Sequence, residues 1–221
     1  MSGIAVAKLG GSHAFSDTLP AWLAALEGCA GKLVLVCGGG PFADAVRAAQ
    51  PRMGFDDAAA DAMALLAMEQ YAVALAATGR RFVVAGSRAA IRTALRAGKV
   101  PIWAPRRMVT TARRVPASIP PSWEVTSDSL AAWLAGELAA QRLFLIKRVV
   151  VADPCPTAEA LVEAGMVDRA FPRFLAASGA QAFLLGPSDL QGFPLALAAG
   201  TTIGRPIGLV ATPAPIHHGG A

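Results

Sequence analysis

The chain has 221 residues, of which 54% are hydrophobic and 16% charged, and its formal net charge is +5 at pH 7. This length suits one sizeable α/β domain, and so apolar a composition excludes a disordered chain. No run predicts a membrane span or a signal peptide, and no basic stripe interleaved with aromatic residues predicts nucleic-acid binding, so we expect a cytoplasmic protein without membrane or nucleic-acid partners.

Short apolar runs rich in β-branched residues alternate along the chain with segments of helical periodicity. The predicted strands cover residues 4–7, 32–37, 81–85, 100–103, 143–147, 181–185 and 207–210. The first predicted helix is capped by Ser16 or Asp17 and runs to residue 26, and the third is capped by Ser87 and runs to residue 95. Other predicted helices cover residues 57–78, 130–140, 157–164 and 171–177, and two more begin at 41 or 42 and at 188. Residues 104–123, with four prolines and four arginines, predict an irregular excursion, and 212–221 predict a flexible tail. The alternation predicts a three-layer αβα sandwich around a mainly parallel sheet, in one domain over residues 1–211.

The first predicted strand carries a lysine at its carboxyl end and runs directly into a glycine turn. Lys8 is followed by Gly10, Gly11 and Ser12. Glycines let the backbone approach a ligand closely, and such a turn offers N–H groups to an anion beside the lysine charge. The combination favours a phosphate site.

A second glycine turn, Gly38-Gly39-Gly40, follows the second predicted strand and precedes a helix. Read literally, Gly38, Gly40 and Ala43 match a relaxed dinucleotide-binding fingerprint. That fingerprint requires a further strand ending in an acidic residue about 20 positions later. The chain has a long helical pattern there instead, which argues against a nicotinamide or flavin cofactor.

Residues 126–129 read Thr-Ser-Asp-Ser and precede the helix predicted at 130–140. Ser127, Asp128 or Ser129 would cap this helix, and the helix dipole would favour an anion there. A plain N-cap is the simpler interpretation, whereas Asp128 would also be placed to orient a lysine or hold a metal ion. Lys147 ends the fifth predicted strand as Lys8 ends the first, so the two lysines are candidates for acting together.

Taken in order, four motifs resemble those of the amino acid kinase superfamily, which includes uridylate, carbamate, acetylglutamate and isopentenyl phosphate kinases. The motifs are Lys8-x-Gly10-Gly11-Ser12, Gly38-Gly39-Gly40 with Phe42-Ala43-Asp44, Thr126-Ser127-Asp128-Ser129 and Gly200-Thr201-x-Ile203. The absence of a Gly-x-x-x-x-Gly-Lys-[Ser/Thr] motif excludes a P-loop kinase. Residues 63–70 and 123–129 are most similar to the branch that phosphorylates aminomethylfuran-methyl phosphate in methanofuran and methylofuran biosynthesis.

The resemblance implies an ATP- and Mg²⁺-dependent kinase that converts (5-(aminomethyl)furan-3-yl)methyl phosphate to the diphosphate. It also implies an acceptor-binding half near residues 1–123, a nucleotide-binding half near 124–211, and assembly as a homodimer or larger homo-oligomer. The implied catalytic residues are Lys8, Asp128 and Lys147, with Asp128 also the candidate Mg²⁺ ligand. The implied phosphate- and nucleotide-binding residues are Gly10, Gly11, Ser12, Ser127 and Ser129. The candidate acceptor-binding residues are Gly38, Gly39 and Gly40, together with Arg113 and Arg114, whose guanidinium groups would match a phosphate.

Two alternatives stay open. An enzyme of the same fold would take another small carboxylate, carbamate or phosphate monoester. A noncatalytic nucleotide- or oxyanion-binding protein, similar to molybdenum storage proteins, is favoured by the sequence after Lys147, which lacks the Asp-Gly turn of many relatives. The apolar residues 58–77 fit either core packing or a dimer interface, and His13 is expected to be an exposed loop residue rather than a phosphate ligand.

Overall fold

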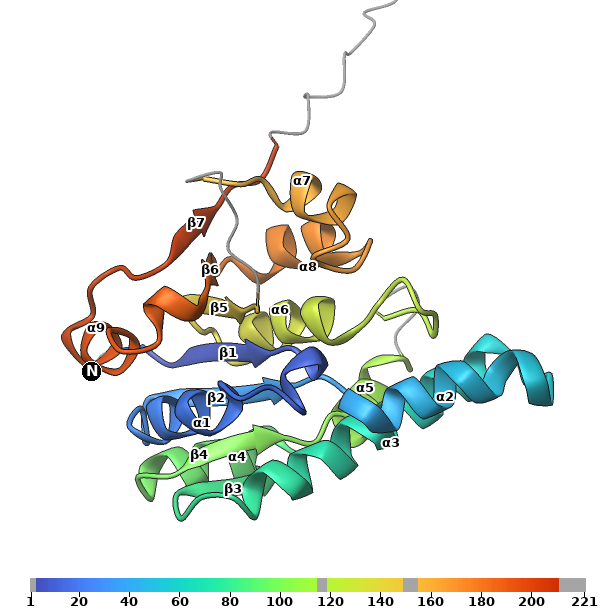
Figure 1. Ribbon diagram of the computed structural model, residues 1–221, viewed down its shortest axis with the longest axis horizontal. Helices are drawn as coiled ribbons and strands as arrows, with labels where there is room; N and C mark the ends of the chain where they lie inside the picture. The colour runs from blue at the N-terminus through green and yellow to red at the C-terminus, as the bar shows by residue number, and fades with distance from the viewer. Residues whose placement is uncertain (1–2, 115–118, 149–154, 211–221) are drawn as a thin grey trace, which may run out of the picture.

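The structure is a computed structural model that describes residues 3–114, 119–148 and 155–210 (Figure 1). Over these residues the strands form one seven-stranded sheet in the order β3-β4-β2-β1-β5-β6-β7. All neighbouring strands pair in parallel except β7, which runs antiparallel to β6. The predicted sandwich with a mainly parallel sheet is therefore confirmed. The strands are β1 (Ala5–Leu9), β2 (Leu33–Cys37), β3 (Phe82–Ala85), β4 (Val100–Trp103), β5 (Arg142–Ile146), β6 (Gln181–Leu185) and β7 (Arg205–Ile207).

Helices cover both faces of the sheet, because successive side chains of a strand point to opposite faces. Val6 and Val34 pack on one face against α4, α6 and α8, whereas Ala7 and Leu35 pack on the other face with α1 and α9. The central strands are consequently buried along their whole length. The helices are α1 (Leu19–Glu27), α2 (Gly40–Met53), α3 (Asp57–Ala76), α4 (Arg88–Arg96), α5 (Arg106–Ala112), α6 (Ser127–Glu137), α7 (Ala158–Glu163), α8 (Phe171–Ser178) and α9 (Phe193–Ala199).

Helices α2 and α3 pack side by side and extend past the carboxyl ends of β1 and β2 (Figure 1). By length and composition alone, α3 would be able to cross a membrane. Its packing gives another reason for the apolar sequence, because Leu65, Met68 and Leu75 are buried against the sheet. On the outer side of the same helix, Leu66 and Val73 are exposed.

The starts of several helices differ from the predictions. Helix α1 begins at Leu19, later than a cap at Ser16 or Asp17 predicts, and its N-cap residue is Thr18. The Ser16 hydroxyl bonds instead to the backbone N–H and the hydroxyl of Thr18. Helix α2 begins at Gly40, one residue early, and α6 begins at Ser127, three residues early.

The predictions for two other segments were partly wrong. Residues 106–112 of the expected irregular excursion form helix α5, because Pro105 stands before its first turn, where a missing N–H costs nothing. The last helix begins at Phe193, and Ser188 lies instead in a short 3₁₀ turn, η2 (Pro187–Asp189). The last strand lies at 205–207, ahead of the predicted 207–210. The expected tail at 212–221 falls outside the described residues.

Candidate functional site

The carboxyl ends of β1 and β5 mark the point where the chain reverses its direction of travel across the sheet. Strand β2 follows β1 in the sequence and lies on one side of the β1–β5 pair, whereas β6 follows β5 and lies on the opposite side. Leu9 and Ile146 are register partners, so the turns that leave the two strands lie next to each other. In open parallel sheets, ligands bind in the crevice at such a point.

Three of the predicted site residues, Lys8, Asp128 and Lys147, meet in this crevice. The Nζ atom of Lys8 lies 2.8 Å from Oδ1 of Asp128, and Nζ of Lys147 lies 3.0 Å and 3.2 Å from the two carboxylate oxygens. Their side chains are only 5%, 7% and 12% exposed, respectively. Lys147 also donates to the backbone carbonyl of Met166. The chain thus holds two ammonium groups around one carboxylate, largely out of water.

The environment of this cluster shifts the pKa values of two of its members. Burial disfavours ionisation of Asp128, but the charges and hydrogen bonds of Lys8 and Lys147 outweigh it and lower the pKa of the carboxyl. Burial and the nearby Lys8 charge lower the pKa of Lys147 to about 8, although Asp128 opposes this. At neutral pH the carboxyl group of Asp128 is therefore ionised, and Lys147 is the member that titrates just above neutrality.

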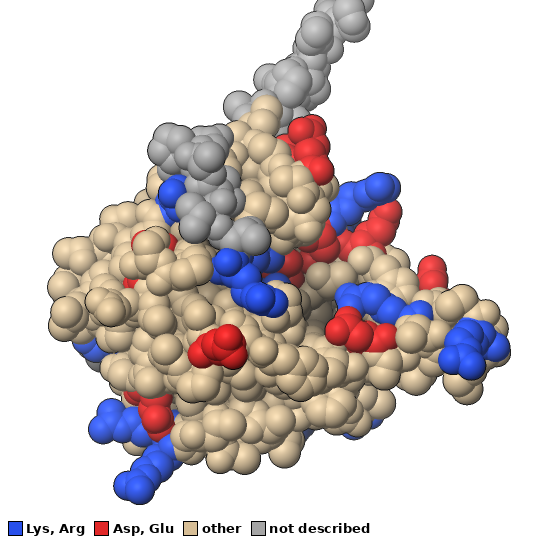
Figure 2. Space-filling model, viewed as in Figure 1, with Lys and Arg blue, Asp and Glu red and all other residues tan. Residues whose placement is uncertain are grey.

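A cavity of about 430 Å³ opens beside the cluster, and the space-filling view shows a hollow on this face bordered by basic and acidic side chains (Figure 2). Lys8 and Asp128 form part of its inner wall, and Ala64, Leu65 and Met68 of α3 supply an apolar stretch. The predicted residues Gly11, Ser12, Gly38, Gly39, Gly40 and Ser127 also line it. Gly10 belongs to the same turn but not to the cavity wall.

The two glycine turns touch each other at the inner end of the cavity. A Cβ atom on Gly11 would lie 2.8 Å from the backbone nitrogen of Gly40, and a Cβ on Gly38 would lie 2.8 Å from the nitrogen of Gly11. Gly40 also has a φ of +53°, in the region that favours glycine. Side chains at these positions would push the turns apart, so the sequence needs glycine there for the backbone to form the cavity wall.

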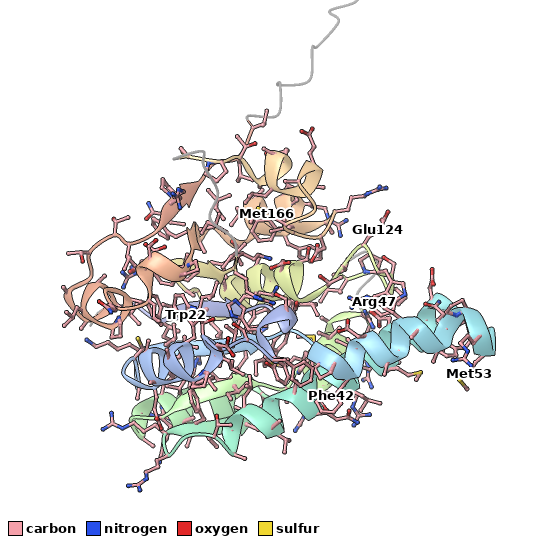
Figure 3. The ribbon with its side chains drawn as sticks, in the orientation of Figure 1. Trp22, Phe42, Arg47, Met53, Glu124 and Met166 are labelled. Atoms are coloured by element: carbon pink, nitrogen blue, oxygen red, sulfur yellow. The ribbon has the colours of Figure 1, made fainter. Side chains whose placement is uncertain are left out.

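Arg47 and Trp123 also line the cavity, and no sequence pattern predicted them as site residues. Arg47 of α2 lies with its guanidinium carbon 4.7 Å from the centre of the Trp123 ring, and it pairs with Asp44. The indole N–H of Trp123 donates to Gln50 over 2.8 Å. Figure 3 shows Arg47 facing the segment that carries Glu124. The bond between Gln50 and Trp123 joins residues 73 positions apart, so no local sequence signal indicated where Trp123 lies.

Two predicted site residues, Arg113 and Ser129, take other partners, and Arg114 lies outside the cavity wall. The guanidinium of Arg113 binds both carboxylate oxygens of Asp61, at 2.5 and 2.8 Å, and neither Arg113 nor Arg114 lines the cavity. The hydroxyl of Ser129 donates to Asp168, and its side chain is fully buried. The expectation that Ser127, Asp128 or Ser129 caps α6 is also wrong, because Asp168 accepts the N–H groups at that end of the helix.

His13 is buried, which contradicts its expected place in an exposed loop. Burial and the charges of Arg148, Lys8 and Lys147 lower the pKa of its imidazole to about 4. Neither ring nitrogen has a well-aligned hydrogen-bond partner among the described residues. His13 is therefore uncharged at neutral pH and adds nothing to the positive charge of the crevice.

In the part of the chain that the structure describes, the carboxylates of the site do not gather into a metal centre. Among the described residues, no three His, Cys, Asp or Glu side chains gather as a metal site. The oxygens of Asp128 are engaged by two ammonium groups. This donor set does not fit a Mg²⁺ ion held by the protein, since Mg²⁺ needs oxygen ligands in octahedral geometry.

Comparisons with known proteins identify the family and the fold. The model of the amino acid kinase family matches residues 3–155, and no curated protein matches the sequence. Uridylate kinase from Archaeoglobus fulgidus has a similar structure, with a TM-score of 0.68 and 17% identity over 92% of this chain and 99% of that one. The UMP kinases from Ureaplasma parvum and Bacillus anthracis give TM-scores of 0.62 and 0.60 at 15% and 16% identity, covering 94% and 93% of this chain and 98% and 96% of theirs. At these identities the likeness concerns the fold.

Proposed function

The chain belongs to the amino acid kinase family and is a phosphotransferase, and we propose that it transfers the γ-phosphoryl group of ATP to a small phosphate monoester. The acceptor we propose is (5-(aminomethyl)furan-3-yl)methyl phosphate, and the product is the corresponding diphosphate. The observation that carries the proposal is the Lys8–Asp128–Lys147 cluster in the crevice between β1 and β5, beside a cavity walled by two glycine turns.

The lining of the cavity supports an acceptor with an anionic end and a small apolar body. Its inner end has Lys8 and glycine backbone, which suit a phosphate. Its middle is apolar, with side chains such as Leu65, Met68 and Leu130, which suit a compact ring. Arg47 stands seven positions after Gly40 in α2, about 10 Å along the helix axis. We propose that the acceptor spans this distance, from the glycine turn to Arg47. The choice of a furan rests on the sequence resemblance of residues 63–70 and 123–129.

In the proposed reaction, an oxygen of the acceptor phosphate attacks the γ-phosphorus of ATP. A bond from that oxygen to phosphorus forms while the bond to the oxygen bridging the β- and γ-phosphates breaks, and ADP leaves. The attacking phosphate is already ionised, so no general base is needed. The ammonium groups of Lys8 and Lys147 would balance the negative charge of the transferring group, and Asp128 would keep both aimed at it.

The placement of the two substrates follows the proposed halves of the chain. The cavity lining comes chiefly from the first half, with residues 122–130 closing it, and this supports residues 1–123 as the main acceptor-binding part. Lys147 and Arg148 stand on the other side of the first glycine turn, where Arg148 donates to the carbonyl of Ser12 over 3.2 Å. We place the ATP phosphates there, within residues 124–211. Any Mg²⁺ would enter on the nucleotide phosphates, because the protein's own donors do not fit it.

We also propose that two copies assemble through the outer face of α2 and α3. Phe42, Met63 and Leu66 are exposed there and line a shallow apolar groove of about 380 Å³. Val73 continues the same exposed row on α3. An apolar strip of this kind is unusual on a monomer and typical of an interaction surface.

The test is a panel of acceptors incubated with ATP and Mg²⁺. The panel contains the furan phosphate, UMP, carbamate and N-acetylglutamate, and ³¹P NMR identifies the product. From the furan phosphate we expect the two ³¹P doublets of its diphosphate beside those of ADP. We also expect kcat/KM at least about tenfold above that for UMP, a difference of about 1.4 kcal/mol in transition-state binding. Higher kcat/KM for UMP would overturn the proposed acceptor. Nucleotide binding without transfer to any member would favour the noncatalytic alternative.

A further inference from the structure

A carboxylate outside the reacting cluster holds the first turn of α6 in place. Asp168 lies between α7 and α8 and accepts four hydrogen bonds, all from Thr126 and Ser129. The two backbone N–H groups are each 3.0 Å from Oδ2, and the Thr126 hydroxyl is 2.8 Å from it. The Ser129 hydroxyl donates to the other oxygen.

These bonds replace the cap that α6 lacks. Thr126 occupies the N-cap position, but its side chain does not cap the helix and turns to Asp168 instead. A negative group at a helix N-terminus is favoured by the helix dipole and by the unpaired N–H groups of the first turn. Here that group comes from about 40 residues further along the chain, so the capping contact is also a tertiary contact.

The same short segment also binds Lys147. The carbonyl of Met166, two residues before Asp168, accepts a hydrogen bond from Nζ of Lys147, and Gly165 lines the cavity. Asp128 lies in the first turn of α6, between Thr126 and Ser129. Residues 165–168 therefore contact both the lysine and the helical turn that carries its carboxylate partner.

We propose that Asp168 is a positioning residue for the phosphoryl-transfer site, which fixes Asp128 relative to Lys8 and Lys147. This inference rests on the proposed function. The rest of α6 does not depend on Asp168, because Leu130, Leu134 and Leu138 anchor it in the core. Loss of the carboxylate should loosen the first turn and leave the remaining turns packed, and small displacements at a reacting site reduce rate strongly.

The experiment compares Asp168→Ala and Asp168→Asn with Ser87→Ala. Ser87 is a matched control, because its hydroxyl caps α4 by accepting the N–H of Ala90 and is not part of the cavity wall. We expect Asp168→Ala to lower kcat about 100-fold with less than about a threefold change in acceptor KM. Asp168→Asn, which keeps an oxygen acceptor, should recover much of that loss. Ser87→Ala should lower the thermal midpoint but leave kcat unchanged.

A second readout does not need turnover. In NMR of ¹³C-labelled lysine, Lys147 should titrate near pH 8 in the parent protein, and at lower pH in Asp168→Ala, because its carboxylate partner has moved away. If the parent transfers no phosphoryl group, the proposed function fails, and this titration still decides the positioning role. Unchanged kcat and unchanged Lys147 titration, with a lowered thermal midpoint, would reduce Asp168 to a helix cap and overturn the inference.

Should Asp168→Ala fail to fold, Ser129→Ala removes only one of the four bonds to the carboxylate. We expect it to shift kcat and the Lys147 titration in the same directions, by smaller amounts. The absence of any shift would equally contradict the inference.

Discussion

Replacing Asp128 by asparagine tests the role of the one carboxylate that two buried lysines share. The substitution keeps the size of the side chain but leaves the ammonium groups of Lys8 and Lys147 without their counterion, 2.8 Å and 3.0 Å from the altered group. Removing one partner of a buried ion pair costs about 3–5 kcal/mol of unfolding free energy. We expect a value near the lower end, because Lys147 has a pKa of about 8 and escapes part of the cost by losing its proton.

The dependence of kcat and of the unfolding free energy on pH gives the direction of each expected change. A pKa of about 8 leaves Lys147 about 90% charged at pH 7 and about 10% charged at pH 9, so kcat of the parent enzyme should fall across this range. In Asp128→Asn the pKa of Lys147 falls further, so the decline in kcat should move below pH 8. The unfolding free energy that Asp128→Asn loses relative to the parent should also be smaller at pH 8 than at pH 7. In this range the folded variant binds fewer protons at Lys147 than the folded parent does, whereas the unfolded chains bind the same number. The stability of the variant therefore rises more steeply with pH.

The assays are initial rates from pH 6 to 9.5 and urea unfolding at pH 7 and pH 8. Asp189→Asn serves as a control, because Asp189 accepts the N–H of Gly186 in η2 and is not part of the cavity wall. Its pH profile should match that of the parent. If kcat of the parent stays constant to pH 9.5 and the pH dependence of kcat is the same in Asp128→Asn, the charge of Lys147 takes no part in the reaction.

Three further predictions concern Lys8, the first glycine turn and the proposed dimer. Lys8→Ala should lower kcat/KM by about 1,000-fold, or about 4 kcal/mol of transition-state stabilisation, with circular dichroism unchanged; unchanged turnover would remove Lys8 from the mechanism. Gly11→Ala should raise acceptor KM at least about tenfold, because its Cβ would lie 2.8 Å from the backbone of the other glycine turn. Gly10→Ala should raise acceptor KM less, because its Cβ would meet no atom nearer than 3.4 Å. Equal KM values for the two variants would argue against the close contact of the turns. In light scattering, Leu66→Glu should yield monomers and Leu195→Glu, equally apolar but on α9, should not; a monomeric parent protein would contradict the proposed dimer.

The features that could be predicted from the sequence are those set by neighbours along the chain. Lys8 and Lys147 each end an apolar strand, and the carboxyl ends of parallel strands meet at one edge of a sheet. Strand prediction therefore placed both lysines at one edge of the sheet, whereas the pairing of β1 with β5, which brings them together, was not predicted. The glycine turns were likewise recognisable, because each directly follows a strand.

The features that could not be predicted depend on partners far along the chain. The side chain of Arg113 is directed by Asp61, 52 positions earlier, and this removes it from the wall of the cavity. Ser129 is turned inward by Asp168, 39 positions later. No periodicity or motif contains such pairings, because they depend on how α3, α6 and the segment before α8 pack together.

Two lysines around one buried carboxylate leave an excess positive charge inside the protein, which opposes folding until an anion offsets it. An anion that binds only the folded state adds about 2.7 kcal/mol of stability at 100 times its dissociation constant. Inorganic phosphate or sulfate should therefore protect the protein against heat and storage, and removing such salts should make it more labile. The charge arrangement that we propose for phosphoryl transfer should thus also make the stability of the whole fold depend on the anions in solution.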